Sequence, residues 1–182
     1  MEHHSDKELL ELYRNGGNRH YAFSLLVNKF QKQIYWHIRR IIIDHDDTND
    51  VVQNTFIKVW NSLDKFREDA QFYTWLYRIA TNEAINFIKK KRRKLFIPFT
   101  DVEHQLSNTL HADSFFKGSD IQQKLQKAIL TLPLKQRIVF NMKYFEDMKY
   151  EDMSKVLGTS TGALKASYHI AVKKIEKILT GD

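Results

Sequence analysis

An aromatic cluster that runs into an uninterrupted cationic block is the part of this sequence best suited to bind another molecule. Phe72, Tyr73, Trp75 and Tyr77 lie within six residues, and the run Lys89-Lys90-Lys91-Arg92-Arg93-Lys94 follows them. An aromatic ring can stack on the π face of any base, contributing ~1–3 kcal/mol per base, while a cationic groove follows the phosphates. The segment therefore indicates a surface for unstacked nucleic acid.

The same segment has the spacing of a helix, so some of its apolar residues must face a core. We assign three of them mainly to core packing: Phe72, Ile79 and Phe87. Consecutive helix positions differ by ~100°. Tyr73, Trp75 and Tyr77 therefore cannot all share the core face, and one or two of them should be exposed. A cationic run at the end of a helix also suits the negative end of the helix dipole.

Composition excludes several classes of protein. The 182 residues contain no cysteine, which excludes disulfides, thiolate metal sites and cysteine nucleophiles. No apolar run approaches the ~20 residues needed to cross a bilayer, and the acidic N-terminus fits neither a signal nor a transit peptide. We expect a soluble, cytoplasmic protein. Six glycines and two prolines favour long helices, and the net charge of +7 suits a polyanionic partner or an anionic membrane surface.

Capping signals and apolar spacing predict an all-α fold of two small helical domains. Ser5-Asp6-Lys7-Glu8 has the pattern of a capping box, and Gly16-Gly17 ends the short helix that it starts. A second helix begins near Arg19, and Asp44 to Asp47 offer N-caps for a third. The helix described above, from Phe72 to Lys94, is the fourth. We predict a first domain at 1–94, a linker at 95–119 and a second domain at 120–182.

The C-terminal part has the layout of a helix-turn-helix. A short helix at 150–157, a turn at Gly158-Thr159-Ser160 and a longer helix at 161–179 are expected. Steps of four and three in the longer helix predict its buried side: Leu164, Tyr168, Ala171, Ile175 and Ile178. The opposite side carries Gly162, Ala166, His169 and Lys173, with Lys165 at its margin. An ordinary helical hairpin with a solvated face is the alternative interpretation.

An acidic cluster is the best candidate for a metal site. Asp44, Asp46, Asp47 and Asp50 surround His45, but carboxylates at a helix start also satisfy free N–H groups. We favour that structural role, with a docking surface for a basic partner as the functional alternative. The sequence contains no phosphate-binding glycine loop, nucleophile elbow or paired histidine-glutamate motif. We expect no cofactor, no metal, no catalytic residue and no enzymatic activity.

Two segments, 50–60 (DVVQNTFIKVW) and 72–82 (FYTWLYRIATN), closely resemble region two of bacterial sigma factors of the extracytoplasmic-function (ECF) type. Leu132-Pro133 and the helix-turn-helix through Gly162-Ala163-Leu164-Lys165 resemble region four. The resemblance implies a transcription initiation factor that binds core RNA polymerase, directs it to promoters and helps to open the duplex. It also implies a partner by analogy, because many such factors are held inactive by an anti-sigma protein.

The resemblance further implies a role for each set of residues. Contacts to core polymerase are expected from Asp50, Gln53, Asn54, Phe56 and Trp60, with Phe56 alternatively serving the helical core. Recognition of the melted minus-ten element is expected from Phe66, Phe72, Tyr73, Trp75, Tyr77, Arg78 and Asn82. The run Lys89, Lys90, Lys91, Arg92, Arg93 and Lys94 would hold the DNA backbone. The minus-thirty-five element would be read by Ser160, Thr161, Gly162, Lys165, Ser167, His169 and Lys173.

The recognition helix departs from the family pattern. Many members have Ser-Arg after the position of Lys165, where this chain has Ala166-Ser167, and Ile170 replaces a later arginine. A bidentate arginine is the strongest reader of guanine. We therefore expect an altered upstream element, which the sequence does not specify.

Two other functions remain open at this point. A conventional regulator would use the helix-turn-helix alone on a palindromic operator, with 1–94 as a sensor or dimerisation module. A recombinase or nuclease would use the Asp44 to Asp50 cluster to hold a metal. The conventional regulator leaves the aromatic and cationic helix unexplained.

Overall fold

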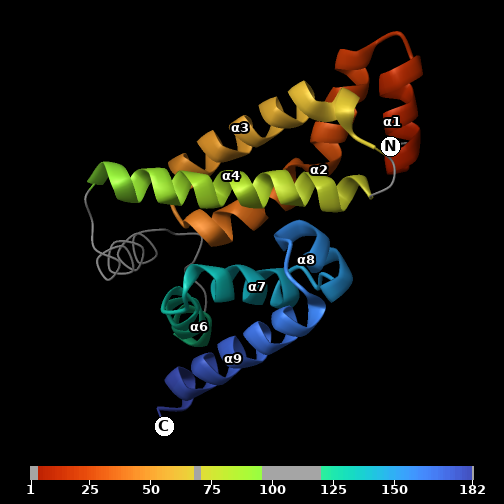
Figure 1. Ribbon diagram of the computed structural model, residues 1–182. Coiled ribbons are helices and arrows are strands. Elements are labelled where there is room, and N and C mark those ends of the chain that lie inside the picture. Colours follow the sequence, from red (N-terminus) through yellow and green to blue (C-terminus); the bar gives the residue numbers. More distant parts are fainter. Residues whose placement is uncertain (1–3, 68–70, 96–119, 182) are drawn as a thin grey trace.

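The computed structural model describes residues 4–67, 71–95 and 120–181, and all regular structure within these ranges is helical. This confirms the predicted all-α class. The predicted linker falls almost entirely on 96–119, outside the described residues. The elements are α1 (Asp6–Asn15), α2 (Arg19–Ile42), α3 (His45–Ser62), the 3-10 helix η1 (Leu63–Lys65), α4 (Phe72–Leu95), α6 (Asp120–Leu130), α7 (Leu134–Tyr144), α8 (Tyr150–Leu157) and α9 (Thr161–Thr180) (Figure 1).

Local capping explains where several helices begin and end. The Ser5 hydroxyl accepts from the Glu8 amide while the Glu8 carboxylate accepts from the Ser5 amide, so the predicted capping box forms. Asp44 caps α3 by accepting from the Asp47 amide at 2.9 Å. Between α8 and α9 the backbone turns at Gly158, whose φ of 63° is unfavourable for residues with a Cβ atom. Sequence signals within a few residues fix these boundaries.

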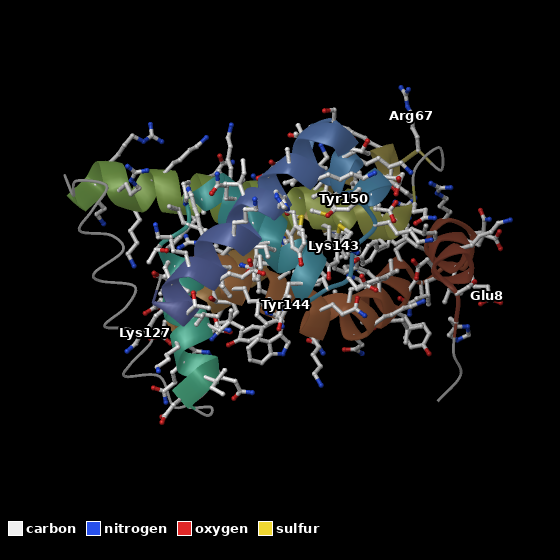
Figure 2. The ribbon with its side chains drawn as sticks, turned by 90° about the horizontal axis from the view of Figure 1, so that it is seen from below. Glu8, Arg67, Lys127, Lys143, Tyr144 and Tyr150 are labelled. Carbon is white, nitrogen blue, oxygen red and sulfur yellow. The ribbon has the colours of Figure 1, made fainter. Side chains whose placement is uncertain are left out.

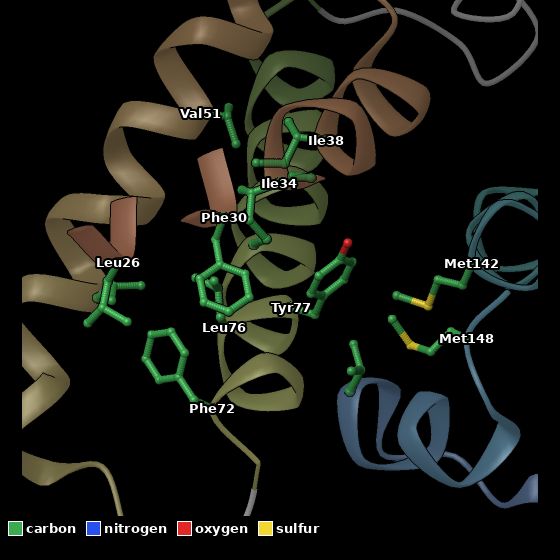
Figure 3. Packing of buried hydrophobic residues seen from close by; sticks show 14 of the residues in the cluster. Leu26, Phe30, Ile34, Ile38, Val51, Phe72, Leu76, Tyr77, Met142 and Met148 are labelled. Atoms are coloured by element: carbon green, nitrogen blue, oxygen red, sulfur yellow. The ribbon is translucent and has the colours of Figure 1, made fainter. Parts of the chain in front are cut away.

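Helix α2 forms the centre of the N-terminal half. Its residues Leu26, Phe30, Ile34 and Ile38 are spaced by four and face α3 and α4. Figure 3 shows them beside Val51 of α3 and Phe72 and Leu76 of α4. The side-chain spacing thus builds one continuous apolar stripe along α2.

The C-terminal half packs directly against the N-terminal half. Helix α8 lies along α4, and α7 contacts α2 (Figure 1). Tyr77 points from α4 toward Met142 and Met148 (Figure 3), and all three belong to the same buried cluster as Met153 and Val156. A second, smaller cluster holds α6, α7 and α9 together: Ala128, Ile129, Leu132, Phe140, Ala171 and Ile175. The C-terminal half therefore has a small core of its own and also contributes residues to the main core of the N-terminal half.

One predicted core position is wrong. Ile178 is 49% exposed, because it lies beyond Ile175, the last α9 residue in the buried cluster. None of the helices in the described ranges is long and apolar enough to cross a membrane.

Candidate nucleic-acid interface

Three aromatic rings cluster where the loop after α3 meets the start of α4. The ring centroids of Phe66 and Trp75 are 4.9 Å apart, and Phe72 lies 5.7 Å from both. Phe66 and Phe72 are buried, whereas Trp75 is partly exposed. Trp75 is therefore the member of this cluster that can offer part of its ring to a base.

Tyr73 and Tyr77 lie on another side of α4. Their ring centroids are 4.4 Å apart, and Tyr77 is also 4.8 Å from the ring of His37. Burial raises the pKa of the Tyr77 hydroxyl far above its usual range and raises that of Tyr73 to a lesser degree. Tyr77 is part of the core shared by the two halves, and only Tyr73 of this pair is partly exposed.

A stripe of exposed side chains, with the partly exposed Trp75 at its start, runs along the outward side of α4. It contains Trp75, Arg78, Asn82, Asn86, Lys89 and Arg93, and we call these six residues the α4 stripe. Successive members are three or four positions apart, which places them on one side of a helix. With a rise of 1.5 Å per residue, the stripe is about 27 Å long. The sequence reasoning missed Asn86, although its helical spacing from Asn82 was a usable signal.

The cationic run at the end of α4 is mostly solvent-exposed. Lys91 forms an ion pair with Asp47 in the first turn of α3, and Arg92 is only partly exposed. The remaining cations are exposed: Lys89, Lys90, Arg93 and Lys94. The run therefore offers positive charge to a polyanion and, through Lys91, also ties α4 to α3.

The acidic cluster at the start of α3 is used in the fold. Asp44 caps the helix, Asp47 pairs with Lys91, and His45 contacts the Tyr35 hydroxyl at 2.8 Å. Among the described residues no group of three or more histidine, cysteine or acidic side chains could hold a metal ion. These contacts agree with the structural role favoured for the cluster.

A groove between α2 and α3 contains most of the residues expected to contact polymerase. It has a volume of about 730 Å³, and its lining includes Asp50, Gln53, Phe56 and Trp60. Asn54 is exposed on α3 but does not line the groove. The sequence reasoning missed Ile57, which is 51% exposed there, and the α2 residues that form the opposite wall: His20, Phe23, Val27 and Gln31. Ile57 thus adds to a contiguous apolar patch in the groove, which is a typical sign of a docking surface.

Trp60 is held in this groove by three other rings. His20 stacks on it with centroids 4.8 Å apart, and Phe23 and Tyr13 meet it edge-on at 5.0 and 5.9 Å. Tyr13 belongs to α1 and the other two to α2. The position of Trp60 therefore depends on the N-terminal helices.

The helix-turn-helix has the predicted layout. Ser160 caps α9 by accepting from the Ala163 amide at 3.3 Å. The expected DNA-reading residues lie on the accessible side of α9 or at its cap: Ser160, Gly162, Lys165, His169 and Lys173 are exposed, and Thr161 and Ser167 partly so. The Lys165 ammonium is 5.7 Å from the centre of the Tyr150 ring, and so is that of Lys143. Figure 2 shows Lys143 close to Tyr150.

Comparison with known protein families identifies both halves. The model described as Sigma-70 region 2 matches residues 26–94, and that described as Sigma-70, region 4 matches 122–175. The RNA polymerase sigma-H factor of Pseudomonas aeruginosa is 33% identical, over 96% of this chain and 93% of that protein. The ECF RNA polymerase sigma-E factor of Escherichia coli K12 is 28% identical, over 94% of this chain and 93% of that protein.

Two solved structures share the fold. CnrH in complex with the cytosolic domain of CnrY has a TM-score of 0.71 at 24% identity, covering 97% of this chain and 98% of that one. The sigma factor RpoE in complex with the anti-sigma factor NepR from Bartonella quintana has a TM-score of 0.68 at 20% identity, covering 88% and 98%. From its two region matches and its near full-length relatives, the chain belongs to the sigma-70 family of RNA polymerase sigma factors, and within it to the ECF type.

Proposed function

We propose that this protein binds core RNA polymerase, directs it to specific promoters and assists strand opening there. The α4 stripe is the observation that carries the proposal, because it joins a partly exposed tryptophan to exposed cations along one helix. At about 27 Å, the stripe is long enough to contact several nucleotides of one DNA strand. A single strand along it would place a base near Trp75 and phosphates near Lys89 and Arg93.

The energetics explain why such a factor works only together with polymerase. Extruding a base costs a few kcal/mol. Stacking on one aromatic ring contributes ~1–3 kcal/mol. Trp75 alone therefore does not offset the cost, and contacts made by polymerase and by the cations must supply the remainder. The factor itself carries no catalytic residue in this proposal, and core polymerase performs the chemistry.

We assign the other two surfaces to polymerase and to the upstream promoter element. Core polymerase would dock on Asp50, Gln53, Asn54 and the groove around Phe56 and Trp60. The outward side of α9, with Lys165, His169 and Lys173, would enter the major groove at the minus-thirty-five element. Because no arginine lies on this side of α9, lysine and histidine would carry the charged contacts.

An anti-sigma protein is a further proposed partner. One structural neighbour was solved with the anti-sigma factor NepR and the other with the cytosolic domain of CnrY. The apolar groove between α2 and α3 is the surface here that such a partner would compete for with polymerase. Both interactions imply that the protein acts in the cytoplasm.

The operator-binding regulator is the weaker alternative. It accounts for the helix-turn-helix but leaves the α4 stripe and the groove without a role. A metal-dependent DNA-processing enzyme has little support, because Asp44 and Asp47 are already engaged in a cap and an ion pair.

The proposal is tested by run-off transcription with purified bacterial core polymerase on fragments of the cognate genome, with and without the protein. Protein-dependent start sites that share two spaced upstream elements are expected. Binding to DNA without affinity for polymerase would overturn the proposal and favour the simple regulator.

A further inference from the structure

Helix α1, which neither region match covers, contacts the loop that precedes α4. The Arg14 Nη2 atom at the end of α1 donates to the Phe66 carbonyl at 2.9 Å, across 52 residues of sequence. Just beyond it, Arg19 Nη1 lies 3.3 Å from Oδ2 of Asp64 in η1. Two arginines from the N-terminus therefore meet the described part of one loop, Leu63 to Arg67. Arg67 projects outward from its end (Figure 2).

The support for Arg14 is firmly packed. Leu9, Leu10 and Tyr13 of α1 are buried against the N-terminal core. Asp6 forms an ion pair with Lys29 of α2 at 2.6 Å, and the capping box fixes the first turn. The Arg14 side chain therefore extends from a helix that is packed against the N-terminal core.

The acceptor of this hydrogen bond belongs to a residue whose ring contacts Trp75. Phe66 has an extended backbone (φ −66°, ψ 120°), and its amide donates to the Leu63 carbonyl. Its ring is buried against Trp75, with centroids 4.9 Å apart. Fixing the Phe66 carbonyl thereby fixes the ring on which Trp75 rests.

The two arginine contacts are not equivalent. In the Arg19–Asp64 pair both side chains are more than half exposed, and such pairs contribute little. The Arg14 bond is partly buried, and its charged donor meets a backbone carbonyl, which makes it one of the stronger kinds of hydrogen bond. Arg19 is therefore a natural control for Arg14.

We propose that Arg14 is a positioning residue for promoter opening: through the Phe66 carbonyl and ring it holds Trp75 where an unstacked base can reach it. This inference rests on the proposed function. The inference gives α1, which lies outside both matched family regions, a role in the opening of promoter DNA. This role does not depend on the sequence of the promoter.

The test compares Arg14→Met, Arg14→Lys and Arg19→Met with the unaltered protein, each bound to core polymerase. Open-complex formation is measured on a duplex promoter and on the same promoter with a mismatched, pre-melted segment. Methionine keeps the length of the side chain but removes the donor, and lysine keeps one charged donor.

We expect Arg14→Met to slow opening of the duplex about tenfold, because the loss of one charge-assisted hydrogen bond has an effect of about that size. On the pre-melted template the loss of rate should stay below about threefold. Arg14→Lys should recover part of the rate, and Arg19→Met should stay within about twofold of the unaltered protein. Equal losses on both templates would mean a merely structural role, and no loss on either would also overturn the inference. If the unaltered protein directs no transcription at all, the proposed function fails instead.

Discussion

The Nδ1 atom of His37 lies 3.0 Å from Oε1 of Glu146, although the two residues are 109 positions apart. On the other side of the ring, Nε2 lies 2.8 Å from the Thr81 hydroxyl. That hydroxyl donates its own hydrogen to the Tyr77 carbonyl at 2.7 Å, so it must accept from His37. The His37 ring therefore bridges Glu146 and Thr81, and α2 is joined to the turn between α7 and α8.

Further polar contacts surround this pair. Arg137 donates to the Ile41 carbonyl at 3.4 Å and Asn141 to the Arg40 carbonyl at 3.2 Å. These carbonyls belong to the last turn of α2, where no intrahelical donor is available. Residues of α7 thus supply hydrogen-bond donors to the carbonyls at the C-terminal end of α2. The interface thus combines these polar contacts with the apolar cluster around Tyr77, and on separation water would satisfy the polar groups.

Removing the Glu146 carboxylate should separate the two halves. Oε1 of Glu146 also lies 3.8 Å from Nη1 of Arg40, and the Glu146 side chain is almost fully buried. Breaking a buried ion pair by removing one partner costs ~3–5 kcal/mol, and the C-terminal half retains the core of α6, α7 and α9. We therefore expect Glu146→Ala to open the molecule rather than unfold it. Small-angle scattering should report a larger radius of gyration.

The control for this experiment is Glu151→Ala, which removes the same charge from an exposed position on α8. Because the sequence contains no cysteine, labels at Asn28→Cys and Glu176→Cys can also report the distance between the halves. Unchanged scattering and an unchanged label distance in Glu146→Ala would contradict the assigned role of this ion pair.

Replacing Trp75 should impair strand opening more than initial binding. Trp75→Ala removes the partly exposed ring of the three-ring cluster, and the loss of one stacked base is worth ~1–3 kcal/mol. The yield of open complexes, followed by the reactivity of unpaired thymines, should fall about fivefold or more. Trp75→Phe should recover part of it. Equal loss of duplex binding and of opening would argue against this assignment.

Lys165 should contribute to recognition of the upstream element. Its ammonium is exposed near the start of α9, beside the Tyr150 ring. Lys165→Ala should weaken binding to the cognate duplex and, if a phosphate contact is lost, reduce the salt slope by about 0.9. Lys177→Ala, in the last turn of the same helix, is the matched control. A variant that still discriminates cognate from scrambled duplex as well as the unaltered protein would remove Lys165 from sequence recognition.

The helices were predictable from the sequence because their signals are local. Ser5 with Glu8, Asp44 and Gly158 each act within a few residues, and the spacing of α2 residues directly gives its buried side. The outward side of α9 followed from the same spacing. Contacts between distant segments decide how these helices pack against one another, and local signals decide where they begin and end.

The arrangement of the two halves could not be predicted in this way. Tyr77 is buried because residues of α7 and α8, more than 60 positions further along, cover it, and nothing near Tyr77 encodes that contact. The bond from Arg14 to the Phe66 carbonyl leaves no trace in the sequence either, since a backbone acceptor has no residue type. The division at 1–94, 95–119 and 120–182 stays a prediction, because the buried cluster crosses it.

Buried and partly buried tyrosines should make the fold sensitive to alkaline pH. Burial raises the pKa of Tyr13, Tyr73, Tyr77 and Tyr168 in the folded state, whereas an unfolded tyrosine titrates near 10. The unfolded state therefore loses protons first. The contribution of these four hydroxyls to the free energy of unfolding is complete below about pH 10 and declines as the pH rises above it.

The absorbance of tyrosinate at about 295 nm should show a delayed phase of tyrosine ionisation that coincides with loss of helical circular dichroism. Tyr77→Phe should make this phase smaller, and complete ionisation of all eight tyrosines near pH 10 with the helices intact would contradict the prediction.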